Sequence, residues 1–136
     1  RSTLFPYTTL FRSEGVNALP LTTTITYEFE FQAAHQLHWH PGPCRSMHGH
    51  SYRCELTFGG ELNEYGIIVD FDEVGVFVNN VLMARLDHTY LNDVIDNPTA
   101  ERIAAAIFED VHQAGLPIVS VRLWETRTSS AVVSRA

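Results

Sequence analysis

The stretch "CRSMHGH" contains residues that could bind a metal or exchange protons. Cys44 supplies a thiol, and His48 and His50 supply imidazoles, all within seven positions. Thiolate sulfur and imidazole nitrogen are ligands that zinc prefers. A site in which all three side chains bind would be closed and structural, whereas a site that leaves the cysteine free could perform chemistry. The choice depends on which side chains the fold brings together.

Two segments with a period-two pattern must position these residues. In residues 24–33 apolar side chains alternate with polar ones, and His35 continues the apolar set. This pattern is typical of a strand with one buried face. In "HGHSYRCELTF", His48 and His50 begin an alternating apolar set. If the two segments pair as an antiparallel hairpin, the end of the first meets the start of the second. We therefore expect His35, His48 and His50 to converge at one end of the buried face.

Three converging imidazoles favour a bound metal over ordinary core packing. They would repel one another when protonated, and they would need polar partners when neutral. Nitrogen ligands suit zinc, and three protein ligands leave a fourth position open. Cys44 could fill that position and close the site, and the spacing does not exclude this. His38 and His40 have the same spacing as the H-G-H pair, but they lie in a Pro- and Gly-rich loop, so we interpret them as rim residues.

Two further positions carry groups suited to proton transfer or ligand binding. Asp87 stands next to His88, and a carboxylate beside an imidazole tunes it for proton exchange. Glu125 continues the apolar face of a strand, where a carboxylate is costly unless N–H donors meet it. A purely structural zinc site would need neither feature. His112, on a predicted helix, is interpreted as solvated.

The remaining pattern predicts the element order ββααββ in one domain. The "DFDE" segment at residues 70–73 is a helix start signal, and "NPTAE" opens a second helix with Asn97 or Thr99 as N-cap. The predicted inner faces of the helices comprise Val74, Phe77, Val78, Val81 and Leu82, then Ile103, Ala106, Ile107, Val111 and Ala114. "IVSVRLWET" alternates as a strand, and "SSAVVSRA" is predicted to be a short last strand. The buried face of the "IVSVRLWET" strand is predicted to hold Val119, Val121 and Leu123.

Length and composition set the outer limits. A chain of 136 residues that is 45% hydrophobic can form one domain with a core. The formal charge of −7 argues against nucleic-acid binding. The sequence has two cysteines and no apolar run of membrane-spanning length, so we expect a cytoplasmic protein that does not bind membranes. Residues 1–13 lack periodicity and resemble a translated sequencing adapter; we predict a non-native leader there and a single domain over residues 14–136.

Several motifs together resemble a known family. From about Thr24 to the C-terminus, the chain is similar to the 6-pyruvoyl-tetrahydropterin synthase superfamily in five ordered segments: "FQAAH", "CRSMHGH", "LDHTYLN", "NPTAE" and "WET". Cys44 lies four positions before the H-G-H pair. This gap most resembles the bacterial subgroup that makes 6-carboxytetrahydropterin for queuosine.

The resemblance implies an architecture and a metal. The fold would be an α+β T-fold, with an antiparallel sheet and two helices on one face. Such sheets join side by side into a homo-oligomeric barrel, commonly trimers paired into hexamers. His35, His48 and His50 would bind Zn²⁺ and leave an open position for the substrate.

The resemblance also implies roles for the other candidates. Cys44 would be the general base. Asp87 would orient His88, which would relay a proton to or from the substrate side chain. In one arrangement, His88 and the substrate would belong to different subunits. The substrate-binding residues would be Glu125, Thr99 and Glu101. The reaction would convert 7,8-dihydroneopterin triphosphate to 6-carboxy-5,6,7,8-tetrahydropterin, acetaldehyde and triphosphate. Alternatives are a 6-pyruvoyl-tetrahydropterin synthase, a folate-pathway pterin side-chain lyase, or a non-catalytic zinc- or pterin-binding module with Cys44 as fourth ligand.

Overall fold

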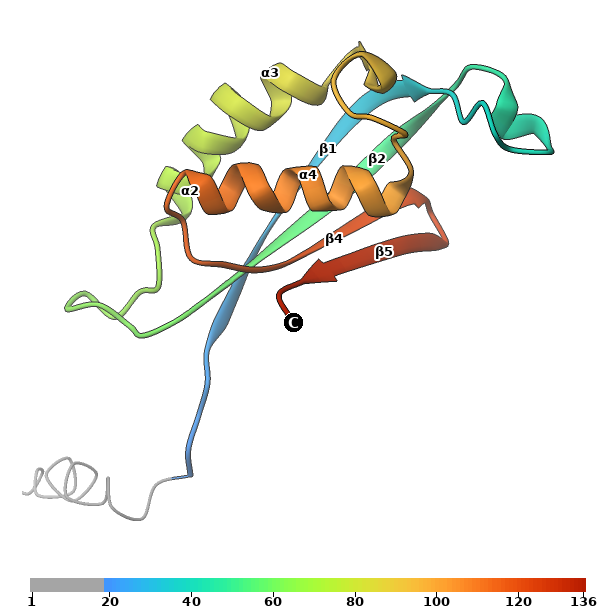
Figure 1. Ribbon diagram of the computed structural model, residues 1–136. Helices are drawn as coiled ribbons and strands as arrows, with labels where there is room; N and C mark the ends of the chain where they lie inside the picture. Colours follow the sequence, from blue (N-terminus) through green and yellow to red (C-terminus); the bar gives the residue numbers. More distant parts are fainter. Residues whose placement is uncertain (1–18) are drawn as a thin grey trace, which may run out of the picture.

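The computed structural model describes residues 19–136 as one five-stranded sheet with its helices on one face (Figure 1). The predicted leader at residues 1–13 lies outside the described residues. The sheet order is β3-β1-β2-β4-β5. The strands are β1 (Thr24–His35), β2 (His48–Gly59), β3 (Thr89–Tyr90), β4 (Ile118–Thr126) and β5 (Ser129–Ser134). None of the helices in residues 19–136 combines the length and the apolar character needed to span a bilayer.

The long β1–β2 ladder is the centre of the sheet. It is antiparallel and continuous in register from Thr24 opposite Gly59 to His35 opposite His48, so the predicted hairpin is confirmed. Its apolar side chains form the core beneath the helices because successive residues of a strand point to opposite faces. The core side chains of these two strands are Phe31, Ala33, Tyr52, Cys54, Leu56 and Phe58. The other face of the ladder carries mainly polar and charged side chains.

The sheet differs from the antiparallel arrangement that we expected. β3 pairs with β1 in parallel, with Ala33 opposite Thr89 and Ala34 opposite Tyr90. The sheet is therefore mixed. This strand lies in "LDHTYLN", for which the sequence predicted neither a helix nor a strand, and a 3₁₀ helix over Leu91–Asp93 follows it. A two-residue strand has no periodicity to detect, and only its pairing partner defines it.

The first helical segment contains α2 (Phe71–Phe77), a π-helical turn (Val78–Leu82) and α3 (Met83–Leu86). The Asp70 side chain accepts a hydrogen bond from the Asp72 N–H at 2.8 Å, so the predicted start signal is confirmed. The wider π turn keeps positions four residues apart on one face. Val81 is consequently 41% exposed, although helical spacing had placed it inside. The buried positions are Val74, Val78, Leu82 and Leu86.

The second helix, α4 (Ala100–Gln113), has Thr99 as its N-cap, because the Thr99 hydroxyl accepts from the Arg102 N–H. Its buried side chains are Ile103, Ala104, Ile107, Phe108 and Val111. The predicted face is therefore confirmed at three positions, Ala106 is partly buried, and Ala114 is exposed. Ala114 lies at the C-cap, where the helix has already ended before Gly115 at φ 83°.

The strand β4 buries Val121 and Leu123 as expected, but not Val119. A register irregularity between Thr57 and Phe58 of β2 places Ile118 opposite Phe58. Ile118 is therefore buried, whereas Val119 is 40% exposed. Such bulges redirect the side chains beyond them. The barrel-shaped assembly stays a prediction.

Replacing Asp70 with alanine should destabilise the protein without changing its fold. The variant loses the N-cap acceptor, and such losses cost about 1 kcal/mol in the free energy of unfolding. Urea denaturation measures the effect. The control is Glu64→Ala, which removes one negative charge from an exposed turn. Equal stability of the two variants would contradict the assigned cap.

Candidate metal centre

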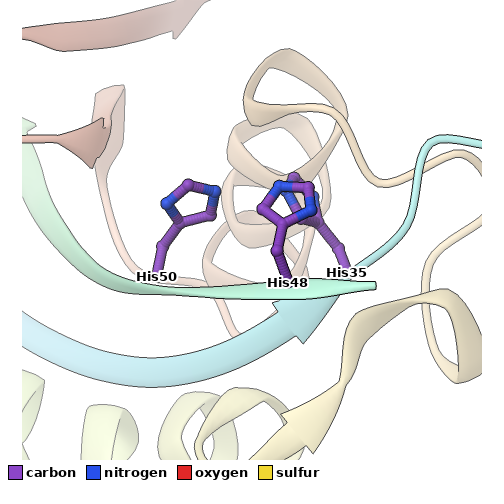
Figure 2. Close-up of side chains that lie close together, drawn as sticks. All are labelled: His35, His48 and His50. Atoms are coloured by element: carbon purple, nitrogen blue, oxygen red, sulfur yellow. The ribbon is translucent and has the colours of Figure 1, made fainter. Parts of the chain in front are cut away.

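Three imidazole rings converge at the closed end of the β1–β2 ladder. His35 lies opposite His48 and Ala33 lies opposite His50, so all three histidine side chains stand on the core face. Figure 2 shows the rings on the same side of the two strands. One nitrogen from each ring lies within 4.8 Å of the others. The convergence predicted from strand alternation is therefore confirmed.

Backbone carbonyls determine which nitrogen of two rings carries the proton. The Nδ1 atom of His35 lies 2.8 Å from the carbonyl oxygen of Pro98, and that of His48 lies 2.8 Å from the carbonyl oxygen of Ser46. A carbonyl can only accept, so each Nδ1–H donates, and in the neutral ring Nε2 keeps its lone pair. The two Nε2 atoms face each other at 3.0 Å. Two lone pairs so close require a cation or a shared proton between them.

The third ring, that of His50, has one buried nitrogen that is left unpaired by the described residues. The Nε2 atom of His50 is buried and has no hydrogen-bond partner among the described residues. Burial lowers the pKa of His50, Glu125 opposes that shift, and His35 and His48 add to it. An uncharged ring with an unused nitrogen suits metal ligation better than a charged one. Two nitrogens bound tetrahedrally to zinc lie about 3.3 Å apart, close to the spacing of His35 and His48.

A carboxylate and a phenol lie beside the three rings. The Oε2 atom of Glu125 is 3.7 Å from Nε2 of His35, and the Glu125 side chain is 27% exposed. The Tyr52 hydroxyl is buried without a partner among the described residues. Burial raises the pKa of Tyr52, and charges on Glu125 and Cys44 raise it further. Glu125 and Cys44 therefore each lie within electrostatic reach of the Tyr52 hydroxyl.

Cys44 lies in a short 3₁₀ helix, Pro43–Arg45, in the loop between β1 and β2. Its carbonyl accepts from the Leu37 N–H at 2.9 Å, which closes the loop. Cys44 is partly exposed and does not belong to the group of three converging ligands. The other cysteine, Cys54, is buried in the core, and burial raises its pKa. The partly exposed thiol of the described residues is thus that of Cys44, in the loop that precedes His48.

Asp87 and His88 form a pair at the edge of the sheet. The Asp87 carboxylate accepts from the Gln32 N–H and from Nδ1 of His88, both at 2.8 Å. The hydrogen bond from Gln32, and then that from His88, lower the pKa of Asp87. The His88 ring is 79% exposed and borders a surface hollow with Ala34 and Ser51. No hydrogen bond or ion pair of the described residues joins this pair to the three histidines.

The start of α4 lies next to the centre through its backbone. Pro98, whose carbonyl contacts His35, immediately precedes Thr99. The Thr99 hydroxyl oxygen caps the helix, which leaves its hydrogen free to donate, and Glu101 is exposed in the first turn.

Similarity to known proteins agrees with this geometry. The sequence pattern of the 6-pyruvoyl tetrahydropterin synthase family matches residues 24–136. The chain belongs to this family. A Synechocystis protein named 6-carboxy-5,6,7,8-tetrahydropterin synthase is 41% identical over 112 residues, which cover 76% of this chain and 87% of the relative. A Pyrococcus furiosus protein named dihydroneopterin monophosphate aldolase is 33% identical over 107 residues, which cover 74% of this chain and 88% of the relative.

A solved structure confirms the fold of the family. The structure of Caenorhabditis elegans 6-pyruvoyl tetrahydropterin synthase superposes with a TM-score of 0.75 and 20% identity, covering 85% of this chain and 97% of that chain. The T-fold expected from the resemblance is therefore confirmed for the single chain.

Some contacts of this family member had no signal in its sequence. The carbonyls of Pro98 and Ser46 orient two histidines, but every residue has a carbonyl, so side-chain patterns do not reveal them. Trp39, which lies between the rim residues His38 and His40, donates from its indole nitrogen to Oδ1 of Asn97 at 2.7 Å. His112 accepts from Arg135 at 2.8 Å and lies on α4 away from the centre.

The stability contributed by Asp87 should depend on pH. Its folded pKa is depressed, so its contribution is present above the unfolded pKa, about 4, and is lost as pH falls through the folded pKa. Asp87→Asn should therefore destabilise the protein more at pH 7 than at pH 3, measured by urea denaturation. The control is Asp93→Asn, at the exposed last residue of the 3₁₀ helix, for which we expect a small effect at both pH values. A deficit of the Asp87 variant that grows toward pH 3 would contradict the assigned hydrogen bonds.

Proposed function

We propose that this chain is a zinc-dependent carbon–carbon lyase. It converts 7,8-dihydroneopterin triphosphate to 6-carboxy-5,6,7,8-tetrahydropterin, with release of acetaldehyde and triphosphate, as a cytoplasmic step of queuosine biosynthesis. The observation that carries the proposal is the convergence of three imidazoles beside Glu125, with the partly exposed Cys44 in the adjoining β1–β2 loop. Family membership and the name of the Synechocystis relative support a pterin as the substrate.

The donor set fits zinc. His35, His48 and His50 offer three nitrogens, and the backbone contacts of the first two direct their Nε2 lone pairs inward. Bound zinc supplies Lewis acidity, which makes side-chain hydroxyl groups of a pterin substrate and the adjacent C–H bond more acidic. The carbonyls of Pro98 and Ser46 hold two of the ligand rings in one tautomer and orientation. Hydrogen-bond partners of metal ligands have the same role in other metal sites.

Glu125 and Cys44 have separate tasks at this centre. The Glu125 carboxylate accepts two N–H bonds from the aminopyrimidine edge of the pterin, a bidentate match that orients the substrate. The Cys44 thiolate removes a proton from the substrate side chain, and its partly exposed position permits this contact. Thr99 and Glu101, at the start of α4 of a neighbouring chain, contribute further contacts to the pterin.

Asp87 and His88 complete the site from a neighbouring copy of the chain. Because Asp87 holds Nδ1 of His88, the Nε2 atom is left to exchange protons with the substrate. The exposed His88 ring at the sheet edge, without a bond to the histidine cluster, supports this arrangement. Side-by-side joining of sheets in a trimer-based hexamer would place the pair of one chain at the centre of the next.

One alternative has a specific observation in its favour. The Pyrococcus furiosus relative, at 33% identity, is named an aldolase of dihydroneopterin monophosphate, so similarity alone does not select the product. A 6-pyruvoyl-tetrahydropterin synthase is the third enzymatic candidate. A non-catalytic module with Cys44 as fourth ligand is disfavoured, because Cys44 lies outside the group of converging ligands.

The purified protein should bind one zinc per chain through its three histidines. His48→Ala should lose most of this zinc, measured by elemental analysis after dialysis, whereas the control His112→Ala should keep it.

Zinc should also raise Tm, because binding to the folded state alone stabilises it by about 4 kcal/mol at a thousandfold excess over Kd. Cobalt-substituted protein should show no thiolate charge-transfer band. A band that disappears in Cys44→Ala would overturn the open site.

Incubation with dihydroneopterin triphosphate should yield 6-carboxytetrahydropterin and acetaldehyde, identified by mass spectrometry. Cys44→Ala and His88→Ala should each lose at least about a hundredfold in kcat while retaining zinc, since general acid–base groups contribute about 10²–10⁴-fold.

Mixing the two variants in one oligomer should restore about a quarter of the activity, because random assembly pairs an intact Cys44 with a neighbour's intact His88. No recovery in proven mixed oligomers would place the whole site in one chain.

A further inference from the structure

A strained backbone position lies one residue before Pro98, whose carbonyl contacts the metal centre. Asn97 adopts φ 48°, in the left-handed region that residues other than glycine rarely occupy. The next residue is Pro98, whose carbonyl oxygen accepts the Nδ1–H of the fully buried His35. Such conformations persist only where surrounding contacts hold them, and they often occur at functional sites.

Two hydrogen bonds hold Asn97 in this conformation. The indole Nε1–H of Trp39 donates to its side-chain oxygen at 2.7 Å, and the Thr99 N–H donates to its carbonyl oxygen, also at 2.7 Å. The Trp39 side chain is 62% exposed, so burial does not explain its position. An exposed tryptophan at the rim thus reaches across from the β1–β2 loop to the segment before α4. The indole hydrogen bond is its specific connection to that segment.

The direction of the Pro98 carbonyl depends on the backbone at Asn97. A residue before proline otherwise favours the extended region. If Asn97 relaxed to that region, the Pro98 carbonyl would turn, and the buried Nδ1–H of His35 would lose its acceptor. The ring could then move its proton to Nε2, which is the nitrogen that faces His48 at 3.0 Å. A ring with its proton on Nε2 has no lone pair there for a metal.

We propose that Trp39 is a positioning residue for the metal centre: its indole N–H holds Asn97 in the left-handed conformation that presents the Pro98 carbonyl to His35. This inference rests on the proposed zinc site. Loss of a direct outer partner of a ligand costs about 10–100-fold in metal affinity. Trp39 acts through two further residues, so the expected loss is at the lower end, about tenfold. The competing role, a stacking surface for the pterin, would leave metal affinity unchanged.

Three single variants and one double variant at the two ends of the contact test the proposal. Trp39→Phe keeps the aromatic ring but removes the N–H donor, and Asn97→Ala removes the acceptor and disfavours the left-handed region. Each should weaken zinc binding by about tenfold, measured by competition with a chromophoric chelator. The double variant should be no weaker than either single one. Asn97→Asp keeps an acceptor oxygen and tolerates the left-handed region, so it should retain wild-type affinity.

The matched control is Trp124→Phe, which removes the only other indole N–H of the chain. Trp124 lies on the opposite face of the sheet, where Arg53 stacks on its ring at 3.5 Å. This variant should bind zinc like the wild type. The Tm of each zinc-free variant is measured alongside. A loss of affinity with Trp39→Phe at unchanged zinc-free Tm supports positioning, and unchanged affinity, or equal losses in Trp39→Phe and Trp124→Phe, overturns it.

A readout without metal separates this inference from the proposed function. In zinc-free protein, long-range ¹H–¹⁵N spectra should show Nδ1 of His35 protonated, and Trp39→Phe should lower the fraction of His35 that carries a proton on Nδ1. If the wild type binds no zinc, the proposed function fails, and the tautomer of His35 still tests the contact. A tautomer that is the same in the wild type and Trp39→Phe would overturn the inference while leaving the zinc site intact.

Discussion

The register between β1 and β2 is the constraint on which the rest of the structure depends. With His35 opposite His48, twelve-residue strands place three imidazoles and the apolar core side chains on the same face. A slip of one residue would move every side chain of a strand to the other face. The hydrophobic residues that bury the ladder beneath the helices therefore also hold the metal ligands together. Folding energy and ligand geometry come from the same pairing.

Local patterns could predict most of this architecture, and the failures have a common cause. Alternation in β1 and β2 and the cap at Asp70 depend on neighbouring residues, so the sequence displays them directly. The exposure of Val119 depends on an irregularity in the partner strand β2, and that of Val81 depends on a π turn. The parallel strand β3 exists only through its pairing with β1. None of these features is displayed by the alternation or the capping residues of its own segment.

The candidate site also has features that local sequence patterns predict and features that they do not. Strand alternation alone predicted the convergence of His35, His48 and His50, because parity decides the face. Alternation could not show that the carbonyls of Pro98 and Ser46 fix the ring tautomers, because every residue has a backbone carbonyl. The role of the Asp87–His88 pair stays a prediction, because the pair is built in one chain and its target is proposed to lie in another. Distances between copies are not encoded in any local pattern.

The loop of residues 36–47 has an evolutionary consequence. Both of its ends are closed by the β1–β2 ladder, and it extends beyond the sheet (Figure 1). Insertions or deletions there would leave the three histidines in place, because the ladder holds them, but they would move Cys44 relative to the metal. The ligand set and the position of the thiol are thus two separable modules of one hairpin. Related chains could keep the first unchanged while lengthening the second, and so alter the chemistry without rebuilding the sheet.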